Sequence, residues 1–377
     1  VMFGLFEVSQ SQRHKMQSYK FRLGLSTFSY RMGSVLSLCA FLIGIISLKG
    51  PLEIWNTAFE QNSVNSTEHR RQLKCINGSF SLKGMESCHP WLSCLEIEKE
   101  LTLTDRYLGS GAEKIVKEGS WQGHPVAVNI LRHEDFFNDF QHNLNMLRLF
   151  SKEPGVHANK VVQLVGWCLI QTPVIITEMH SLGSANNVHT ILKNKFPIFD
   201  TLAFRFDLCI DFVQILYILH SHSDGPRVLC DANDPEKALS QFLLSDNMLL
   251  LLNDMDALPV VNKSSGELIK CGHRELSGDF VAPEQLWPYD IKEFDDDIMQ
   301  YYDEKVDIWK IPDICNYIIG TKAGASKLQL HLFDIHSKCK LEDPEKRPTV
   351  KMVLDYYRNV HSKLGWNTTF QKRNGEG

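Results

Sequence analysis

Residues 105–131 read DRYLGSGAEKIVKEGSWQGHPVAVNIL, and this stretch decides the fold. It holds three runs rich in β-branched and apolar residues, which a G-x-G turn and a Trp-Gln-Gly turn separate. Such runs between glycine-containing turns are typical of strands. The sequence therefore predicts three consecutive strands at residues 105–108, 115–119 and 125–131.

The pattern changes from strands to helices further along the chain. A helix is expected at 136–150, because apolar residues recur there at close to 3.6-residue spacing. Two more strands fit 161–167 and 174–177, and the pattern beyond His180 is mainly helical, including 204–220. This order predicts an α+β fold with a β-rich N-lobe at 105–179 and a helical C-lobe at 180–362.

Length and composition limit the class of protein. The chain has 377 residues, enough for one large two-lobed domain with tails. Hydrophobic residues make up 43% and charged residues 23%, which is typical of a globular protein. The net charge of -5 argues against nucleic acid as a partner, because nucleic-acid binding depends on positive charge.

One segment near the N-terminus is unlike the rest. Residues 32–48 (MGSVLSLCAFLIGIISL) carry no charge, and as a helix they would measure roughly 26 Å, which suits a thin bilayer of the early secretory pathway. Basic residues dominate before this segment, so the positive-inside rule keeps residues 1–31 in the cytosol as a tail. We expect one transmembrane signal-anchor of type II topology. A cleaved signal peptide is the alternative, although residues 49–52 make a poor cleavage site.

Cysteines and glycosylation sequons favour a lumenal position for the remainder. Of ten cysteines, Cys39 lies in the apolar segment, which leaves an odd number beyond it and hence at least one unpaired thiol. A stem is expected at 49–74, a cysteine-containing cap stapled by disulfides at 75–104, and a C-terminal tail at 363–377, with the pairing left open. The N-x-[S/T] sequons lie at Asn65, Asn77, Asn262 and Asn367.

The order of short motifs carries more information than any one motif. A G-x-G turn at Gly109 and Gly111 precedes a V-A-V-N strand, and the hinge-like sequence TEMHSLGS follows at 177–184. The later motifs are Cys230-Asp231, Asn253-Asp254-Met255-Asp256, Val281-Ala282-Pro283-Glu284, Asp307-Ile308-Trp309 and Pro344-Glu345-Lys346-Arg347-Pro348. In this order they resemble the protein-kinase fold. The resemblance implies that Gly109, Gly111 and the hinge residues Glu178 and Met179 hold a nucleotide.

The strand that resembles V-A-I-K ends in Asn129 instead of lysine. Phosphoryl transfer needs a cation there, because negative charge develops on the transferred group. Lys114 lies on the strand next to the one that bears Asn129, and its long stem can reach the same cleft. This arrangement resembles the with-no-lysine kinases. The alternative is that Lys114 is an ordinary solvated strand lysine.

The helix expected at 136–150 has no glutamate where kinases pair one with the strand lysine. His142 stands nearest to that position, and Asp135 and Asp139 remain open as partners. A lysine that has moved need not keep its usual partner.

The catalytic loop also departs from the kinase pattern. Asp231 stands where the base that accepts the acceptor's proton is expected, and the metal-binding asparagine is replaced by Gln241, ten residues later. This spacing implies about five inserted residues near 234–238. The amide oxygen of glutamine can still bind a metal ion, and Asp254 keeps the metal-binding carboxylate of the D-F-G motif. The alternatives are a turn cap for Asp231 and a solvated acidic loop for Asp254.

Three further residues match structural positions of the kinase fold. Glu284 and Arg347 resemble a buried ion pair that ties the A-P-E segment to the helical lobe. Asp307 resembles the helix residue that braces the backbone of the catalytic loop.

Longer blocks are similar to the protein O-mannose kinase family over residues 75–362. These blocks are CGHRELSGDFVAPEQLWP at 271–288, YDEKVDIWKIP at 302–312 and HLFDIH at 331–336. The resemblance implies a single-pass type II kinase of the endoplasmic reticulum membrane with a lumenal catalytic domain. Its acceptor would be the 6-hydroxyl of mannose in an O-linked GalNAc-GlcNAc-mannose trisaccharide on α-dystroglycan.

The same resemblance assigns the site. It implies Asp231 as the base, Lys114 as the phosphate-binding lysine, and Gln241 and Asp254 as metal ligands, with ATP and Mg²⁺ (or Mn²⁺) as cofactors. Two alternatives stay open. Asn129 and the altered loop favour an inactive kinase fold that binds glycans or serves as a scaffold, and a lumenal Ser/Thr protein kinase would share the chemistry.

Overall fold

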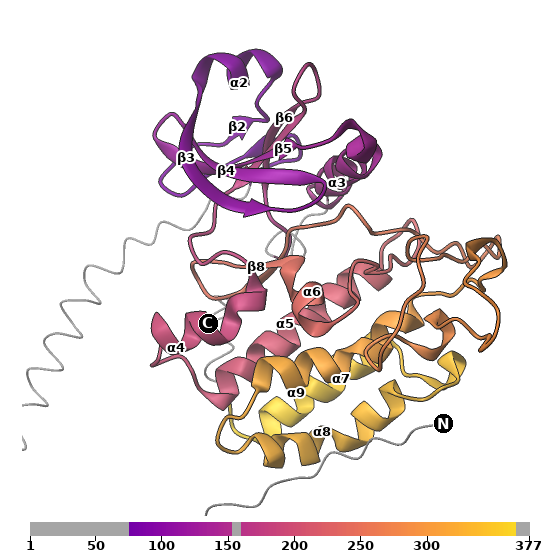
Figure 1. Cartoon of the computed structure of the whole chain (residues 1–377). Helices are drawn as coiled ribbons and strands as arrows, with labels where there is room; N and C mark the ends of the chain where they lie inside the picture. Colours follow the sequence, from indigo (N-terminus) through magenta and orange to yellow (C-terminus); the bar gives the residue numbers. More distant parts are fainter. Residues whose placement is uncertain (1–74, 153–159, 367–377) are drawn as a thin grey trace, which may run out of the picture. The chain divides into compact units, whose positions relative to one another are not determined.

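The main sheet has five antiparallel strands in the order β3-β4-β5-β7-β6 in the computed structural model, which describes residues 75–152 and 160–366 (Figure 1). The strands are β3 (Leu101–Ser110), β4 (Lys114–Trp121), β5 (His124–Leu131), β6 (Leu164–Cys168) and β7 (Val174–Glu178). All five strands expected from the sequence are confirmed. β3 is longer than expected because its pairing with β4 extends back to Leu101.

One long helix packs on this sheet. The helix α3 (Phe137–Phe150) follows a short 3₁₀ turn, η1 (Glu134–Phe136), and it buries Phe140, Leu144 and Leu147 on one face. These positions are three or four residues apart, as one face of an amphipathic helix requires. The helix expected at 136–150 is therefore confirmed.

A small cap precedes the sheet, and disulfides fasten it. The cap consists of β1 (Ser79–Phe80), β2 (His89–Pro90) and α2 (Cys94–Glu100). Cys75 pairs with Cys88 inside the cap, and Cys94 pairs with Cys168 at the end of β6. The second disulfide joins the cap to the main sheet and keeps the two together.

The C-lobe is built around one buried helix, α5 (Leu202–His220), which contacts α7, α9 and β9. Almost every residue of α5 is buried, so this helix has helices or strands on all sides. The other helices are α4 (Val188–Asn194), α6 (Pro235–Ser240), α7 (Lys305–Ile319), α8 (Ala325–Cys339) and α9 (Val350–Lys363). Short 3₁₀ helices are η3 (Ala185–Asn187), η4 (Pro283–Gln285), η5 (Asp296–Ile298) and η6 (Pro344–Lys346).

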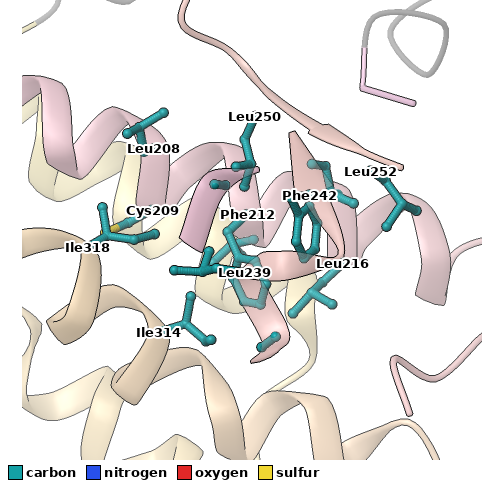
Figure 2. Packing of buried hydrophobic residues seen from close by; sticks show 14 of the residues in the cluster. Leu208, Cys209, Phe212, Leu216, Leu239, Phe242, Leu250, Leu252, Ile314 and Ile318 are labelled. Carbon is teal, nitrogen blue, oxygen red and sulfur yellow. The ribbon is translucent and has the colours of Figure 1, made fainter. Parts of the chain in front are cut away.

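A hairpin of two short strands, β8 (Phe242–Leu244) and β9 (Leu250–Leu252), packs against α5. Figure 2 shows apolar side chains of the hairpin, α5, α6 and α7 gathered in one cluster. The labelled side chains are Leu208, Cys209, Phe212, Leu216, Leu239, Phe242, Leu250, Leu252, Ile314 and Ile318. Close packing of this kind resists displacement. The hairpin thus gives a rigid base to the residues at its two ends, Gln241 and Asn253.

The predicted fold class is corrected in one respect. It placed a single transmembrane helix before the two-lobed domain, but no helix in residues 75–152 and 160–366 has both the length and the apolar character that a bilayer crossing needs. Even α5, the longest of them, carries Arg205, Asp207 and Asp211 and is buried inside the domain. The segment 32–48 itself, with Cys39, lies outside the described residues.

Cysteines and sequons in the described part can be placed. A third disulfide joins Cys230 to Cys271, and the cysteines that remain as buried thiols are Cys209, Cys315 and Cys339. The expectation of at least one unpaired thiol is confirmed. Asn77 is exposed and Asn262 is half-buried, whereas Asn65 and Asn367 lie outside the described residues.

Candidate active site

The register of the sheet places Lys114 beside Asn129. Lys114 pairs with Leu131 and Val116 pairs with Asn129 across β4 and β5. Side chains two residues apart on a strand point to the same face, so Lys114 and Asn129 share one face of the sheet. The side-chain amide of Asn129 is buried and donates to the carbonyl oxygen of Ile175, 3.1 Å away. Asn129 therefore holds neighbouring strands together and leaves Lys114 to supply the cation.

The Lys114 side chain is buried and contacts two carboxylates. Its Nζ lies 2.5 Å from Oδ1 of Asp254 and 3.6 Å from Oε2 of Glu113. Burial alone would lower the pKa of Lys114, but the charges of Asp254 and Glu113 outweigh it and raise this pKa. The ammonium is thus fixed in its charged form, within the molecule and away from bulk water.

Three carboxyl groups gather around this ammonium. Oxygen atoms of Glu113, Asp254 and Asp256 all lie within 4.8 Å of one another. Burial and a hydrogen bond with Asp256 raise the pKa of Glu113 to about 9, and burial with the nearby charge of Asp254 raises that of Asp256. Close carboxylates repel one another when ionised. A hard divalent cation, which prefers oxygen ligands, fits this donor set.

Gln241 links the catalytic loop to the same cluster. Its backbone carbonyl accepts from the amide of Asp254 at 3.0 Å, so the base of the β8–β9 hairpin brings these residues together. Its side-chain nitrogen donates to Oδ2 of Asp231 at 3.0 Å and to the Asp231 carbonyl at 3.2 Å. These contacts orient the amide with its nitrogen toward Asp231.

The other end of the Gln241 amide lacks a partner. Its Oε1 is buried and accepts no hydrogen bond from any residue that the structure describes. A buried carbonyl oxygen without a partner is costly unless a ligand satisfies it. The donor set around Gln241 and Asp254 therefore fits a metal ion.

The base position is held from two sides. Cys230, which directly precedes Asp231, is joined by a disulfide to Cys271. On the same loop, the amide of Leu229 donates to Oδ2 of Asp307 at 3.1 Å, and this oxygen also lies 3.0 Å from Nε2 of His220. Asp307 is thus placed where it supports the loop backbone, as its position in the sequence led us to expect.

The glycine turn lies between β3 and β4, and the hinge follows β7. Gly109 is the second-last residue of β3, and the backbone amide of Gly111 donates to the Lys114 carbonyl at 2.9 Å, which closes the turn. At the hinge, β7 ends at Glu178, whose Oε1 accepts from the amide of Gln163 at 2.9 Å. The side chain of Glu178 is engaged in this bond, so what Glu178 and Met179 offer a nucleotide is their backbone.

The helix α3 contributes a residue that the sequence had not singled out. Oδ1 of Asn143 accepts from the backbone amide of Met255 at 3.1 Å, so α3 holds the Asp254–Asp256 segment directly. His142 is half-buried, and Asp135 and Asp139 are exposed. The carboxylates that contact Lys114 are instead Glu113 and Asp254.

Glu284 and Arg347 form a two-pronged ion pair. The NH1 and NH2 groups of Arg347 lie 2.5 and 2.7 Å from the two carboxylate oxygens of Glu284. The guanidinium also donates to the carbonyl oxygens of Leu341, Lys305 and Glu342, so the buried charge has several partners. Such pairing compensates for the loss of hydration.

Comparisons with known proteins support one family. No family model matches the chain. Human protein O-mannose kinase is 42% identical over 345 residues, which cover 91% of either chain. Protein O-mannose kinase of Gallus gallus is 46% identical over 293 residues, covering 77% of this chain and 80% of the relative. A more distant relative, the human scaffold protein ILK, is 24% identical over 271 residues, or 65% of this chain and 54% of that protein.

Proposed function

The chain belongs to the protein O-mannose kinase family, and we propose that it transfers the γ-phosphoryl group of ATP to a hydroxyl of mannose. The single observation that carries this mechanism is the contact between Lys114 and Asp254, at 2.5 Å. It supplies, from the strand next to Asn129, the cation that phosphate binding needs. The family and this geometry support a phosphotransferase with an alcohol acceptor.

In the proposed reaction the acceptor oxygen attacks the γ-phosphorus of ATP. The bond from phosphorus to the β,γ-bridging oxygen breaks, and ADP leaves with that electron pair. Asp231 orients the hydroxyl and accepts its proton. Lys114 donates to phosphate oxygens of the nucleotide, and the backbone of the glycine turn and of the hinge positions the rest of it.

The oxygens of Gln241, Asp254 and Asp256 would hold Mg²⁺ or Mn²⁺. When bound, a divalent cation neutralises charge on the phosphates. The buried Oε1 of Gln241, which has no partner among the described residues, supports this assignment. Binding of the cation would also reduce the repulsion between the carboxylates near Lys114.

The finer details of the acceptor are part of the proposal, and the resemblance to the family supports them. We assign the transfer to the 6-hydroxyl of mannose in an O-linked GalNAc-GlcNAc-mannose trisaccharide, with α-dystroglycan as the glycoprotein. The three disulfides support a location in the lumen of the endoplasmic reticulum, because disulfides persist in oxidising compartments.

A second candidate is an inactive kinase fold that serves as a scaffold. Asn129 at the place of the strand lysine and the altered catalytic loop favour it. The distant similarity to a scaffold protein points the same way. Against it stands the placement of Asp231, Gln241 and Lys114 around one site, since a scaffold has no need of such an arrangement.

A transfer assay with labelled ATP distinguishes these functions. The full chain is offered the trisaccharide or a Ser/Thr peptide in the presence of Mg²⁺. We expect label on the trisaccharide and little on the peptide. Preference for the peptide would point to a protein kinase, and label on neither substrate from a folded protein would favour the scaffold.

A further inference from the structure

One buried lysine of the C-lobe has no role in the mechanism described so far. Lys310 lies in the first half of α7, and 3% of it is exposed. Within the described part of the chain its ammonium donates one hydrogen bond, to the carbonyl oxygen of Leu229 at 3.4 Å. It also lies 6.0 Å from the centre of the Phe280 ring, which is the outer limit of a cation–π contact. A charged group that is removed from water is therefore matched by few contacts.

A lysine in this place lowers the stability of the fold. Its three donors lose their hydration on burial, and one long hydrogen bond replaces little of it. Burial lowers the pKa of this side chain, although the negative charges of Asp307, Glu284 and Asp231 act against the shift. A methionine has nearly the same length and would fill the space without burying a charge. A residue that is unfavourable for stability is expected where activity depends on it.

Lys310 and Asp307 bind the two polar backbone groups of a single residue, Leu229. They stand three residues apart on α7, so their side chains lie on the same face of the helix. Oδ2 of Asp307 accepts from the amide of Leu229 at 3.1 Å, and Lys310 donates to the carbonyl of that residue at 3.4 Å. Oδ1 of Asp307 is buried and accepts no hydrogen bond from any described residue. The positive charge of Lys310 nearby also compensates this oxygen.

The contacts with α7 fix the course of the chain toward the candidate base. The amide of Val228, one residue earlier, donates instead to the carbonyl oxygen of Pro259 at 3.1 Å. Because a peptide unit is planar, holding the units on both sides of Leu229 fixes its two backbone dihedrals. These dihedrals set the direction in which the chain continues to Asp231, two residues later.

On the basis of the proposed function, we propose that Lys310 is a positioning residue for the base Asp231. Together with Asp307 it holds the backbone of Leu229 in one conformation, and the disulfide of Cys230 holds the residue in between. A displacement of about 1 Å at a reacting group can remove most of its effect, so a fixed loop keeps the carboxylate where the acceptor hydroxyl needs it. The effect of Lys310 passes through the backbone and needs no contact with the nucleotide or the acceptor.

The first test compares Lys310→Met with Lys340→Met in the full chain. Lys340 is a matched control, because it also contacts α7 and an aromatic ring, through Asp313 and Trp309. We expect Lys310→Met to lower kcat about 10- to 100-fold, with the KM for ATP nearly unchanged. Its melting temperature should equal or exceed that of the wild type, since a buried charge with few partners is removed. Lys340→Met should keep the kcat of the wild type.

A second measurement follows the loop itself, without any substrate. Hydrogen exchange of the backbone amides at 228–232 is measured by mass spectrometry in the wild type and in both variants. We expect these amides to exchange about tenfold faster in Lys310→Met, because local opening needs less free energy once the carbonyl of Leu229 has lost its donor. They should exchange at the wild-type rate in Lys340→Met, and the amides of α5 should do so in both variants.

Two outcomes would overturn the role of Lys310. One is a Lys310→Met variant that keeps both the kcat and the loop exchange of the wild type. The other is a variant whose melting temperature falls and whose α5 also exchanges faster, which would make Lys310 a structural residue. The exchange measurement needs neither ATP nor acceptor. It therefore decides whether Lys310 holds the loop even if the wild type proves unable to phosphorylate mannose.

Discussion

Lys114 and Asn129 show how single side chains can exchange roles across a sheet. They share one face because Val116, two residues after Lys114, pairs with Asn129. The ammonium of Lys114 on β4 is therefore available at the site, although β5 has Asn129 where a kinase has lysine. Asn129 meanwhile uses its amide to bond Ile175, a contact that a lysine would not reproduce.

Replacing Lys114 with methionine should abolish most of the transfer activity while the domain stays folded. We expect kcat/KM to fall about 100- to 1,000-fold, because a fixed donor to the phosphates is lost. Lys117→Met on the same strand is the control, since Lys117 lies over the ring of Tyr107 and not in the site. Adding Asn129→Lys to Lys114→Met should not restore activity. A fully active Lys114→Met enzyme would show that the cation lies elsewhere.

Glu113 should make the stability of the metal-free protein depend on pH. Its pKa is about 9 in the folded protein, against 4.5 as the ordinary value. The folded state therefore holds a proton that the unfolded state releases, and stability falls as pH rises from about 4.5 to about 9, by up to about 1.4 kcal/mol per pH unit for one proton. Denaturant titrations in chelator should show this slope in the wild type and a flatter one in Glu113→Gln. Equal slopes would contradict the assignment.

The sequence identified some of these side chains and missed others for physical reasons. Lys114 and Gln241 could be found because this sequence lacks a lysine and an asparagine that the kinase motifs have, and each of the two residues can take over the missing function. Glu113 was missed because alternation along a strand would send it away from Lys114, yet it lies in the turn before β4, where alternation does not hold. Asn143 carries no pattern of its own, and only the packing of α3 reveals its bond to Met255.

Among the elements, the strands and the long helices were the most predictable. Their apolar periodicity extends over many residues, and the periodic apolar side chains are the ones that become buried in the sheet or around α5. The insertion near 234–238 was expected from the motif spacing, but no conformation was predicted for it, and it forms the helix α6. Asp234 followed by Pro235 is a helix-start signal that could have revealed it. The helix is too short for a periodic pattern to show.

The disulfide between Cys230 and Cys271 ties the catalytic loop to the segment that leads into η4. Replacing both cysteines with serine should lower kcat, because Asp231 directly follows Cys230 and loses its support. Stability should drop by about 2–4 kcal/mol. The measurements are initial transfer rates and denaturant unfolding of the purified variant.

Removing the disulfide between Cys75 and Cys88 is the matched control for that experiment. It lies in the N-terminal cap, before the first strand of the main sheet. The double serine variant in the cap should lose stability and keep its kcat. If both variants lost kcat equally, the effect would come from general destabilisation and not from the position of Asp231.

For the domain as a whole, the lobes meet at the site through the contact of Lys114 with Asp254. The order of motifs along the chain was enough to predict this two-lobed fold, because the motifs follow one another as they do in protein kinases. The pairing of the cysteines could not be predicted, since it depends on which loops the fold brings together. The partner of Cys94, for example, is Cys168, 74 residues away.

Ligand binding between the lobes should stabilise the entire domain. We expect Mg-ATP at a hundredfold excess over its dissociation constant to raise the free energy of unfolding by about 2.7 kcal/mol. Thermal unfolding with and without nucleotide measures this, and Lys114→Met should show a smaller gain at the same concentration. A wild-type protein whose unfolding is indifferent to Mg-ATP would favour the scaffold.

The position of phosphate in the product tests the central claim most directly. The full chain is incubated with Mg-ATP and the trisaccharide, and the product is analysed by phosphorus and proton NMR. We predict one phosphomonoester, coupled to the protons on carbon 6 of mannose, and none with Lys114→Met. Phosphate on another sugar or hydroxyl, or none from a folded protein that binds ATP, would contradict the account.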